Sequence, residues 1–301
     1  MTNDFFAELT RCLRKQGIDS EIQKDRRLEI FLHGQPALFV SPKNEVFLLP
    51  EMSGNDEAGD LYHEVAQISD EVFSYADEAL YYKNKGIPGY KAHPGGPVEF
   101  DMEVHQAVRD AVGNNYILMS DPVGEYSMGD AVQVGRQLER LGYKWFEEPF
   151  RDFELYKYSE LCRALDIPIA ATETTRGCHW GVAQVIAQRA ADIVRADVSW
   201  KDGITGTLKI AHLADSFGMN CELHTTTMNY MDLVNVHVSC AIRNCEYFEY
   251  FVPEDNYRLP MKGDLPIRDG RIYVPEAPGV GAELDWDLIQ RNCHSYRCQE
   301  L

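Results

Sequence analysis

Charged residues recur at the ends of short apolar runs between residues 91 and 249. The runs are KAH, YILMSD, YKWFE, PIAATE, DIVRAD, MNCELH and CEYFE, and they end at positions 93, 121, 147, 173, 197, 224 and 249. Three consecutive runs end in a carboxylate: Asp121, Glu147 and Glu173. Clustered carboxylates repel one another without a cation, and an all-oxygen ligand set suits Mg²⁺. If these run ends meet in space, they predict a magnesium site.

The regular spacing of the run ends predicts repeated strand–helix units. Successive ends lie 24 to 28 residues apart, a length that suits one strand, one helix and two short loops. Helix signals occupy the gaps: residues 127–142 begin with a serine and end with a glycine, and residues 204–218 also end with a glycine. Seven such units favour an α/β fold of the TIM-type (β/α) barrel, with its active site at the strand ends. A doubly wound open sheet is the alternative, but it would not ordinarily gather all seven ends around one centre.

The stretch YKWFEEPF, residues 143–150, contains two adjacent carboxylates. Side chains alternate along a strand, so Glu147 and Glu148 must face opposite ways. We expect Glu147 to face inward onto the metal and Glu148 to face outward, toward the helices or a strand-end loop. No His or Cys is found among the three run-end carboxylates, so zinc fits less well than Mg²⁺. Helix capping is the alternative role, and it explains one such residue better than three at equal steps.

The motifs, taken in order, resemble the mandelate racemase/muconate lactonizing enzyme family of the enolase superfamily. GYKAHPGG resembles its K-x-K or K-x-H motif on the second barrel strand, and MSDP, FEEP and ATET resemble its three metal-ligand strands. RADVSWKDGITG with ELHTTT resembles its Asp–His pair, CEYFE its eighth-strand glutamate and PGVGAELDWDLI its C-terminal segment. The resemblance covers about residues 75–290. It implies a (β/α)7β-like barrel with Mg²⁺ as the cofactor.

The resemblance also implies removal of a proton next to a substrate carboxylate. His93 would be one acid/base, and Lys91 would place positive charge near that carboxylate; the two are separated by one residue and so share a side of their strand. On the opposite face, His224 would be the second acid/base, oriented by Asp197. The alternatives are a turn residue for His93 and a structural histidine for His224.

The resemblance implies that Glu249, at the end of the seventh run, hydrogen-bonds the developing oxyanion or a substrate hydroxyl. Glu246 is the alternative, although Glu249 better fits the inward phase. With acid/base groups on two faces, the site could dehydrate a sugar acid through an enediolate, which is the favoured reaction. Racemisation, epimerisation or cycloisomerisation by the same residues is the second choice.

The N-terminal region departs from the family pattern. Residues 1–60 form a small, atypical α+β segment that is too short for the usual cap, residues 61–290 form the barrel, and residues 291–301 form a C-terminal tail. The only candidate for the first barrel strand is EVFLLP, residues 45–50. A truncated or fused family member with a metal site but little turnover is therefore a second hypothesis, and a simple binding module is a third.

The composition of the chain argues against several classes of binding partner. The formal charge is −19, without a long basic run, which argues against nucleic acid. No apolar run is long enough to cross a membrane, and no signal peptide is evident. The eight cysteines are scattered without a CxxC pair, which favours reduced thiols in a cytoplasmic protein. The expected partner is a small carboxylate substrate, and the family resemblance implies a homo-oligomer.

Overall fold

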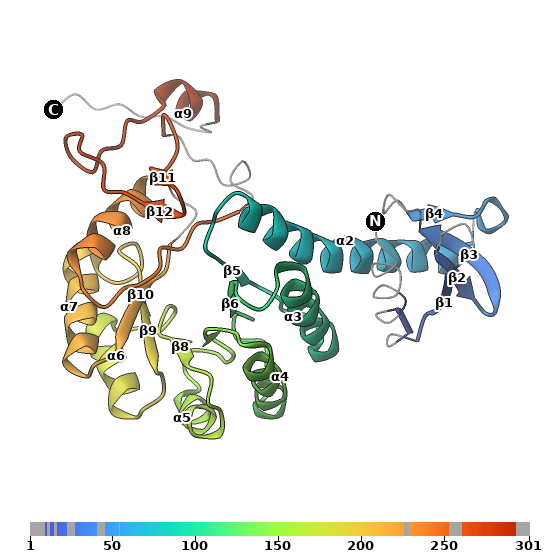
Figure 1. Ribbon diagram of the computed structural model, residues 1–301, viewed down its shortest axis with the longest axis horizontal. Helices are drawn as coiled ribbons and strands as arrows, with labels where there is room; N and C mark the ends of the chain where they lie inside the picture. Colours follow the sequence, from blue (N-terminus) through green and yellow to red (C-terminus); the bar gives the residue numbers. More distant parts are fainter. Residues whose placement is uncertain are drawn as a thin grey trace. The chain divides into compact units, whose positions relative to one another are not determined.

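The computed structural model describes residues 10, 13–14, 17–22, 28–40, 46–53, 55–225, 229–252 and 261–292. The chain divides into two compact units: Met1–Ser120 with Arg140–Gly142, and Asp121–Glu139 with Tyr143–Leu301 (Figure 1). All three predicted metal ligands belong to the second unit.

The first unit begins with an antiparallel sheet. Its strands, in spatial order, are β1 (Asp19–Ile22), β2 (Leu28–Leu32), β3 (Gln35–Val40) and β4 (Val46–Leu48). Alternate residues of β2, Leu28 and Ile30, are buried with Leu38 in one apolar cluster, as a sheet with one covered face requires. β3 and β4 pair antiparallel, and residues 41–45 between them lie outside the described residues. Because β4 belongs to this antiparallel sheet, EVFLLP, the candidate for the first barrel strand, does not form that strand.

A long helix, α2 (Asp56–Asn84), follows the short 3₁₀ helix η1 (Pro50–Met52). Its N-terminus is set by a capping residue just before Asp56. The side chain of Asn55 accepts a hydrogen bond from the backbone N–H of Ala58, and Asp56 and Glu57 lie in the positive first turn. Such a cap satisfies amides that would otherwise lack partners. The cap therefore fixes the start of the helix at Asp56.

The first parallel strand pair also lies in the first unit. Strands β5 (Gly89–Ala92) and β6 (Ile117–Ser120) pair in parallel and are connected by α3 (Val98–Val112). The buried guanidinium of Arg109 donates hydrogen bonds to four backbone carbonyls that end helices or begin a strand. Those carbonyls belong to Gly113, Tyr116, Leu141 and Gly142. One side chain thus satisfies several buried acceptors around the predicted strand–helix junctions.

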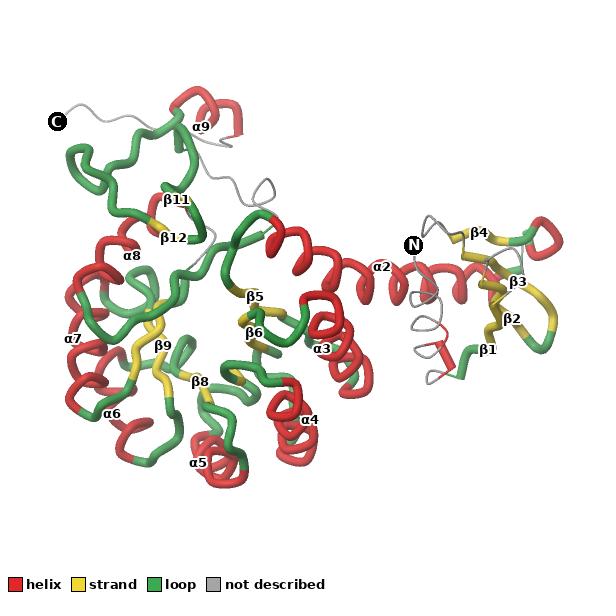
Figure 2. The backbone as a smooth tube through the Cα atoms, in the orientation of Figure 1, coloured by secondary structure: helices red, strands yellow, loops and turns green. Residues whose placement is uncertain are grey.

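The second unit continues the strand–helix repeat. After α4 (Met128–Leu141), strands β7 (Phe146–Glu147), β8 (Ile169–Ala171), β9 (Ile193–Ala196) and β10 (Asn220–Leu223) pair in parallel in chain order. Helices α5 (Leu155–Ala164), α6 (Cys178–Ala187), α7 (Gly203–Ser216) and α8 (Asn229–Ala241) lie on the outer side (Figures 1 and 2). Every residue of β8 and β9 is buried, as expected for parallel strands covered on both faces. The predicted α/β fold is confirmed.

Local signals place the helix ends where the sequence predicted them. The hydroxyl oxygen of Ser127 accepts a hydrogen bond from the backbone N–H of Asp130, which caps α4, and Gly142 follows the helix with a positive φ of 66°. Gly218 ends α7 in the same way, with φ 71°. The seventh run makes only an isolated parallel bridge, between Phe248 and Leu223.

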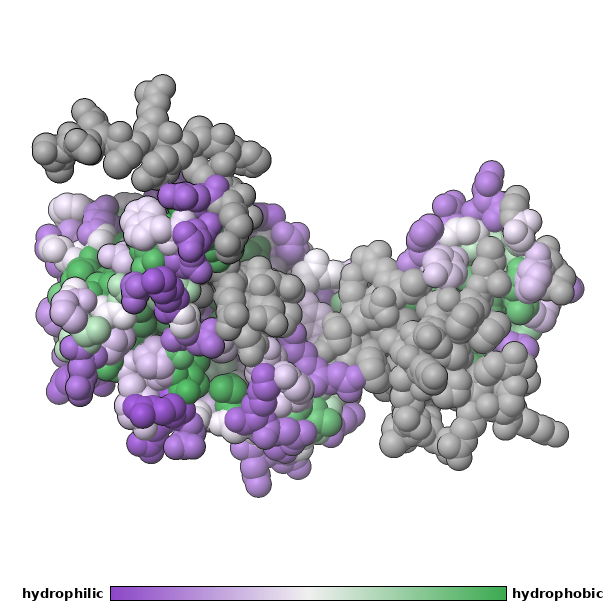
Figure 3. Space-filling model, turned by 90° about the horizontal axis from the view of Figure 1, so that it is seen from above, coloured by the Kyte–Doolittle hydropathy of each residue, from purple (hydrophilic) through white to green (hydrophobic). Residues whose placement is uncertain are grey.

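The described residues of the second unit after α8 form short elements. They include the two-stranded hairpin of β11 (Ile267–Arg268) and β12 (Arg271–Ile272), followed by α9 (Trp286–Asn292). Figure 3 shows hydrophilic side chains over much of the visible described surface, with smaller apolar areas between them. Among the described residues, no helix has the length and apolar character needed to span a membrane.

Candidate metal and acid–base site

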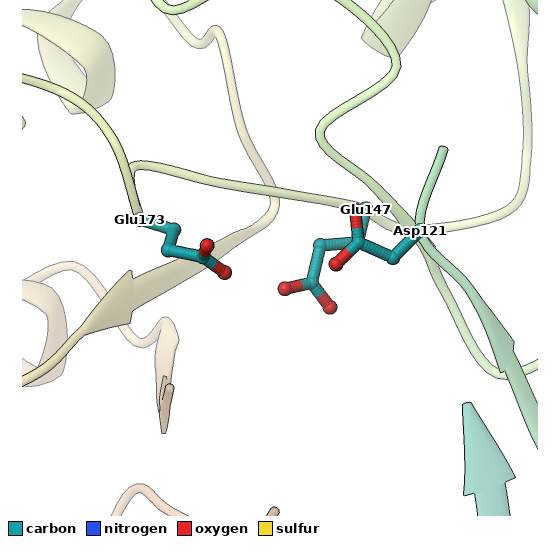
Figure 4. A group of neighbouring side chains, drawn as sticks. All are labelled: Asp121, Glu147 and Glu173. Atoms are coloured by element: carbon teal, nitrogen blue, oxygen red, sulfur yellow. The ribbon is translucent and has the colours of Figure 1, made fainter. Parts of the chain in front are cut away.

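Three buried carboxylates converge in the second unit. Asp121 directly follows β6, Glu147 ends β7 and Glu173 lies two residues beyond β8; they are 3%, 0% and 9% exposed. One oxygen from each lies within 4.8 Å of those from the other two. Figure 4 shows the carboxylates directed into a common space. The predicted convergence of these three run ends is therefore observed.

Glu147 is held through both of its carboxylate oxygens. One carboxylate oxygen lies 2.6 Å from Nε of Arg195, and the other accepts a 2.9 Å hydrogen bond from the indole N–H of Trp145. Trp145 and Glu147 are two residues apart, so strand alternation directs both side chains to the same side. This arrangement confirms that Glu147 faces the interior.

Arg195 is a fully buried cation that the sequence analysis missed. Its NH2 group lies 2.8 Å from a carboxylate oxygen of Glu249 and 3.8 Å from one of Glu173. Burial alone lowers the pKa of Arg195, but the carboxylates of Glu147, Glu249 and Glu173 outweigh this and hold that pKa well above its ordinary value. The sequence VRAD, residues 194–197, contains the signal that could have identified Arg195 as an inward-facing residue. Arg195 stands two residues before Asp197 and so faces the same side of the strand.

The donor set fits a divalent cation. Four carboxylates, those of Asp121, Glu147, Glu173 and Glu249, surround the single guanidinium of Arg195, which leaves buried negative charge only partly compensated. One oxygen from each of the three clustered carboxylates lies within 4.8 Å of the others, and Mg²⁺ prefers such oxygen ligands. Asp121, Glu147 and Glu173 would hold the ion.

A histidine–aspartate pair borders this cluster. Nδ1 of His224 lies 2.8 Å from a carboxylate oxygen of Asp197, and Nε2 lies 3.4 Å from Glu173. The other oxygen of Asp197 accepts hydrogen bonds from the backbone N–H of Ser199 and the side-chain amide of Asn235. Asp197 is thereby fixed, and it orients the imidazole so that Nε2 is directed toward the carboxylate cluster.

Glu148 faces away from Glu147, as strand alternation predicted. Its carboxylate accepts hydrogen bonds from the backbone N–H and the hydroxyl of Thr174, in the loop after β8. Burial raises the pKa of Glu148 to about 7, with a smaller contribution from the negative charges of Asp121 and Glu147. The backbone of Glu148 has a positive φ of 36°, which marks the sharp turn out of β7.

The two candidate glutamates of the seventh run have different surroundings. Glu249 pairs with buried Arg195 and also accepts a hydrogen bond from the backbone N–H of Thr225. Glu246 pairs with Lys144 on the exposed surface. This difference supports the choice of Glu249 as the inward residue. Its proposed contact with substrate stays a prediction.

Lys91 and His93 belong to the first unit. Lys91 lies within β5, and His93 directly follows the strand, where its backbone carbonyl accepts a hydrogen bond from the hydroxyl of Tyr75. Lys91 is half-buried and His93 is exposed. The predicted catalytic roles of both residues stay predictions.

Comparison with known sequences identifies the family. The domain described as "Enolase C-terminal domain-like" matches residues 74–288, which is most of the chain. This chain belongs to the mandelate racemase/muconate lactonizing enzyme family of the enolase superfamily. The resemblance inferred from the motifs is therefore confirmed.

Two curated relatives match most of this chain over part of their own length. It is 32% identical to arabinonate dehydratase of Saccharolobus solfataricus over 225 residues, which cover 74% of this chain and 59% of that protein. It is 31% identical to L-talarate/galactarate dehydratase of Salmonella typhimurium, over 67% of this chain and 49% of that protein. The chain thus spans about half to three fifths of the length of these curated relatives.

A solved structure shares the fold. D-glucarate dehydratase from Agrobacterium tumefaciens, complexed with magnesium, matches with a TM-score of 0.68 and 35% sequence identity. The match covers 73% of this chain and 60% of that chain. Its likeness supports the parallel-strand architecture as that of the enolase-superfamily TIM barrel, and the buried Asp/Glu/Glu cluster resembles a magnesium site of that family.

Removal of Arg195 tests the charge balance of the cluster. We expect Arg195→Gln to lower the free energy of unfolding of the metal-free protein by about 3–5 kcal/mol, because it leaves buried carboxylates without their cation. Saturating Mg²⁺ should restore stability to this variant more than to the native chain, since the ion supplies the missing positive charge. Urea denaturation with EDTA or with Mg²⁺ measures both effects.

Arg243→Gln is the matched control, since Arg243 is exposed and pairs only at the surface with Asp215. It should change stability by less than about 1 kcal/mol. An equal response of the two variants to Mg²⁺ would contradict the proposed link between Arg195 and the metal cluster.

The raised pKa of the buried Asp232 carboxyl should make the stability of the fold depend on pH. Asp232 is buried on α8, and burial, followed by the charges of Asp197 and Glu249, raises its pKa from 3.8 to about 7. Between these two values the folded state binds a proton that the unfolded state does not, so this contribution is complete below about pH 4 and is lost as the pH rises through 7.

We expect Asp232→Asn to be more stable than the native chain at pH 8, by about 1–3 kcal/mol, and to lose less stability between pH 5 and 8. Urea denaturation across this range, without metal, measures the difference. Asp166→Asn is the control, because the Asp166 side chain is 99% exposed. Parallel pH profiles for the native and Asp232→Asn proteins would show that Asp232 does not titrate as described.

Proposed function

We propose that this chain carries the site of a Mg²⁺-dependent sugar-acid dehydratase. The observation that supports the proposal most is the His224–Asp197 pair beside the Asp121, Glu147 and Glu173 cluster. When bound, Mg²⁺ would supply positive charge to the substrate carboxylate and so make its neighbouring proton easier to remove. The three similar proteins reported above are all named as dehydratases of sugar acids, which supports the same substrate class.

The protein's own residues would carry the proton transfers. We assign His93 as the base that takes the proton from the carbon next to the carboxylate, with Lys91 adding positive charge nearby. An imidazole suits this task near neutral pH. Glu249, held by Arg195, would hydrogen-bond the enediolate oxygen or a substrate hydroxyl.

His224 would complete the elimination. Its Nε2 would give a proton to the hydroxyl on the next carbon, the carbon–oxygen bond would break, and water would leave as the carbon–carbon double bond forms. Asp197 would stabilise the charged imidazole before the transfer and orient it throughout. The enol product would rearrange to a 2-keto-3-deoxy acid.

A second candidate function is that of a metal-binding family member with little turnover by itself. The antiparallel pairing of β4 favours it, because the only sequence candidate for the first barrel strand is used elsewhere. An incomplete barrel would expose the site to water and so weaken the electrostatic interactions within it.

Racemisation or epimerisation is an alternative reaction of the same site. It needs the same acid/base residues, with the opposite histidine returning the proton.

Product analysis separates these functions. A library of aldonic and aldaric acids, incubated with the chain and Mg²⁺ in D₂O, should yield a 2-keto-3-deoxy acid from at least one member. We expect His224→Ala to lower kcat by about 10²–10⁴. The Mg²⁺-dependent rise in Tm should persist, since His224 is not a metal ligand.

His212→Ala, at an exposed histidine, is the control and should keep native activity. An epimer carrying deuterium next to the carboxylate would indicate racemisation instead. Stabilisation by Mg²⁺ without conversion of any acid would favour the second candidate, and full activity in His224→Ala would refute the assignment of His224.

A further inference from the structure

A cavity lies against the metal cluster in the second unit. Its volume is about 550 Å³, within the range of ligand sites. The loops after β8 and β9 line it, with Glu173, Thr175 and Arg176 from the first loop and Trp200 and Lys201 from the second. Because Glu173 is a predicted metal ligand, a molecule bound at the metal could extend directly into this cavity.

Two exposed tryptophans form part of the cavity wall. Trp180, near the start of α6, is 69% exposed, and Trp200 is 49% exposed. The Trp200 ring lies 4.7 Å from the ring of His224, so the cavity wall also adjoins the proposed acid/base. Large aromatic rings left open to solvent in a pocket offer apolar contact area for a ligand. Here that area could cover the carbon backbone of a sugar acid.

Arg176 is the exposed cation of the cavity. Among the described residues, no ion pair or side-chain hydrogen bond is found for it, although the chain carries 48 acidic residues against 29 basic ones. The other cation of the wall, Lys201, is 3% exposed and donates a hydrogen bond to the backbone carbonyl of Thr175. The guanidinium of Arg176 is thus the group available to an anionic ligand.

The loop that carries Arg176 is held on both sides. Lys201 holds the carbonyl of the preceding residue, Thr175. After Arg176, the backbone N–H of Gly181 donates to the carbonyl of Gly177, and a Cβ at Gly181 would lie 1.9 Å from the carbonyl oxygen of Arg176. This close approach requires glycine and fixes the backbone at Arg176 against α6. A fixed backbone reduces the ordering cost of binding.

We propose that Arg176, Trp180 and Trp200 form a subsite for the far end of a dicarboxylic sugar acid. The assignment rests on the proposed function, in which the near carboxylate lies at the metal. The guanidinium of Arg176 would bind the second carboxylate through two parallel hydrogen bonds. The tryptophans would contact the carbons between the two ends. The substrate class is therefore an aldaric acid in preference to an aldonic acid.

Paired ligands test this subsite. Calorimetry with saturating Mg²⁺ would measure Kd for aldaric acids and the aldonic acids of the same configuration, galactarate with galactonate among them. At least one aldaric acid should bind 10-fold or more tightly than its partner. Arg176→Gln should weaken binding of that aldaric acid by about 10- to 100-fold and change the Kd of the aldonic acid by less than 3-fold.

Two further variants sharpen the test. Arg189→Gln removes an exposed arginine beyond the other end of α6, outside the cavity, and should leave both affinities unchanged. Trp180→Ala should weaken both acids alike, because it removes contact with their shared carbons. Unchanged Tm values would confirm that the variants fold.

The outcomes separate this inference from the proposed function. No preference of the native chain for any aldaric acid, or an equal loss of both acids in Arg176→Gln, would overturn the subsite even if dehydration is observed. Arg176-dependent binding of an aldaric acid that is never dehydrated would uphold the subsite and reject the proposed reaction.

Discussion

The structure depends on how buried negative charge is balanced around Arg195. Carboxylates at the ends of successive strands cannot share a water-poor space unless cations offset their repulsion. Arg195 provides one fixed positive charge from within β9, and it contacts Glu147 and Glu249 directly. A divalent cation held by Asp121, Glu147 and Glu173 would provide the rest. Arg195 thus holds Glu147 and Glu249 in place through its own charge, and the carboxylate cluster beside it resembles a magnesium site of the family.

Arg195 also connects a regular strand of the sheet with a segment that has almost no regular strand pairing. Glu147 ends a paired strand, whereas Glu249 lies in a segment joined to the sheet by one isolated bridge. Their shared contact with Arg195 holds Glu249 inward without a full strand to position it. The backbone amide of Thr225 adds a second hydrogen bond to Glu249. A side-chain interaction here replaces the ladder of backbone hydrogen bonds that positions the other run ends.

Sequence periodicity predicted the features that depend on repeated geometry. The similar steps between run ends, 24 to 28 residues, predicted the parallel strands and the outer helices. They also predicted the convergence of Asp121, Glu147 and Glu173, because each strand–helix unit returns the chain to the same edge of the sheet. Alternation along a strand correctly assigned opposite directions to Glu147 and Glu148. The pairing of His224 with Asp197 followed from the family motifs and is observed at 2.8 Å.

Sequence periodicity does not predict features that depend on long-range strand pairing or on the conformation of loops. A short apolar run suits a parallel or an antiparallel strand equally, so the sequence of EVFLLP does not reveal that it pairs with β3. Arg195 stands inside its run, so the pattern of run ends does not mark it, although its spacing from Asp197 places it on the same side of the strand. The cavity beside Glu173 combines two loops whose conformations no periodic pattern encodes.

The most direct test of the account is the position of a bound divalent cation. Mn²⁺ can replace Mg²⁺ and scatters anomalously, so crystals of the chain grown with Mn²⁺ would locate the bound cation independently of activity. We expect one anomalous peak that lies about 2.0–2.3 Å from one carboxylate oxygen of each of Asp121, Glu147 and Glu173. A fully occupied peak elsewhere, or none among these carboxylates at saturating Mn²⁺, would contradict this expectation.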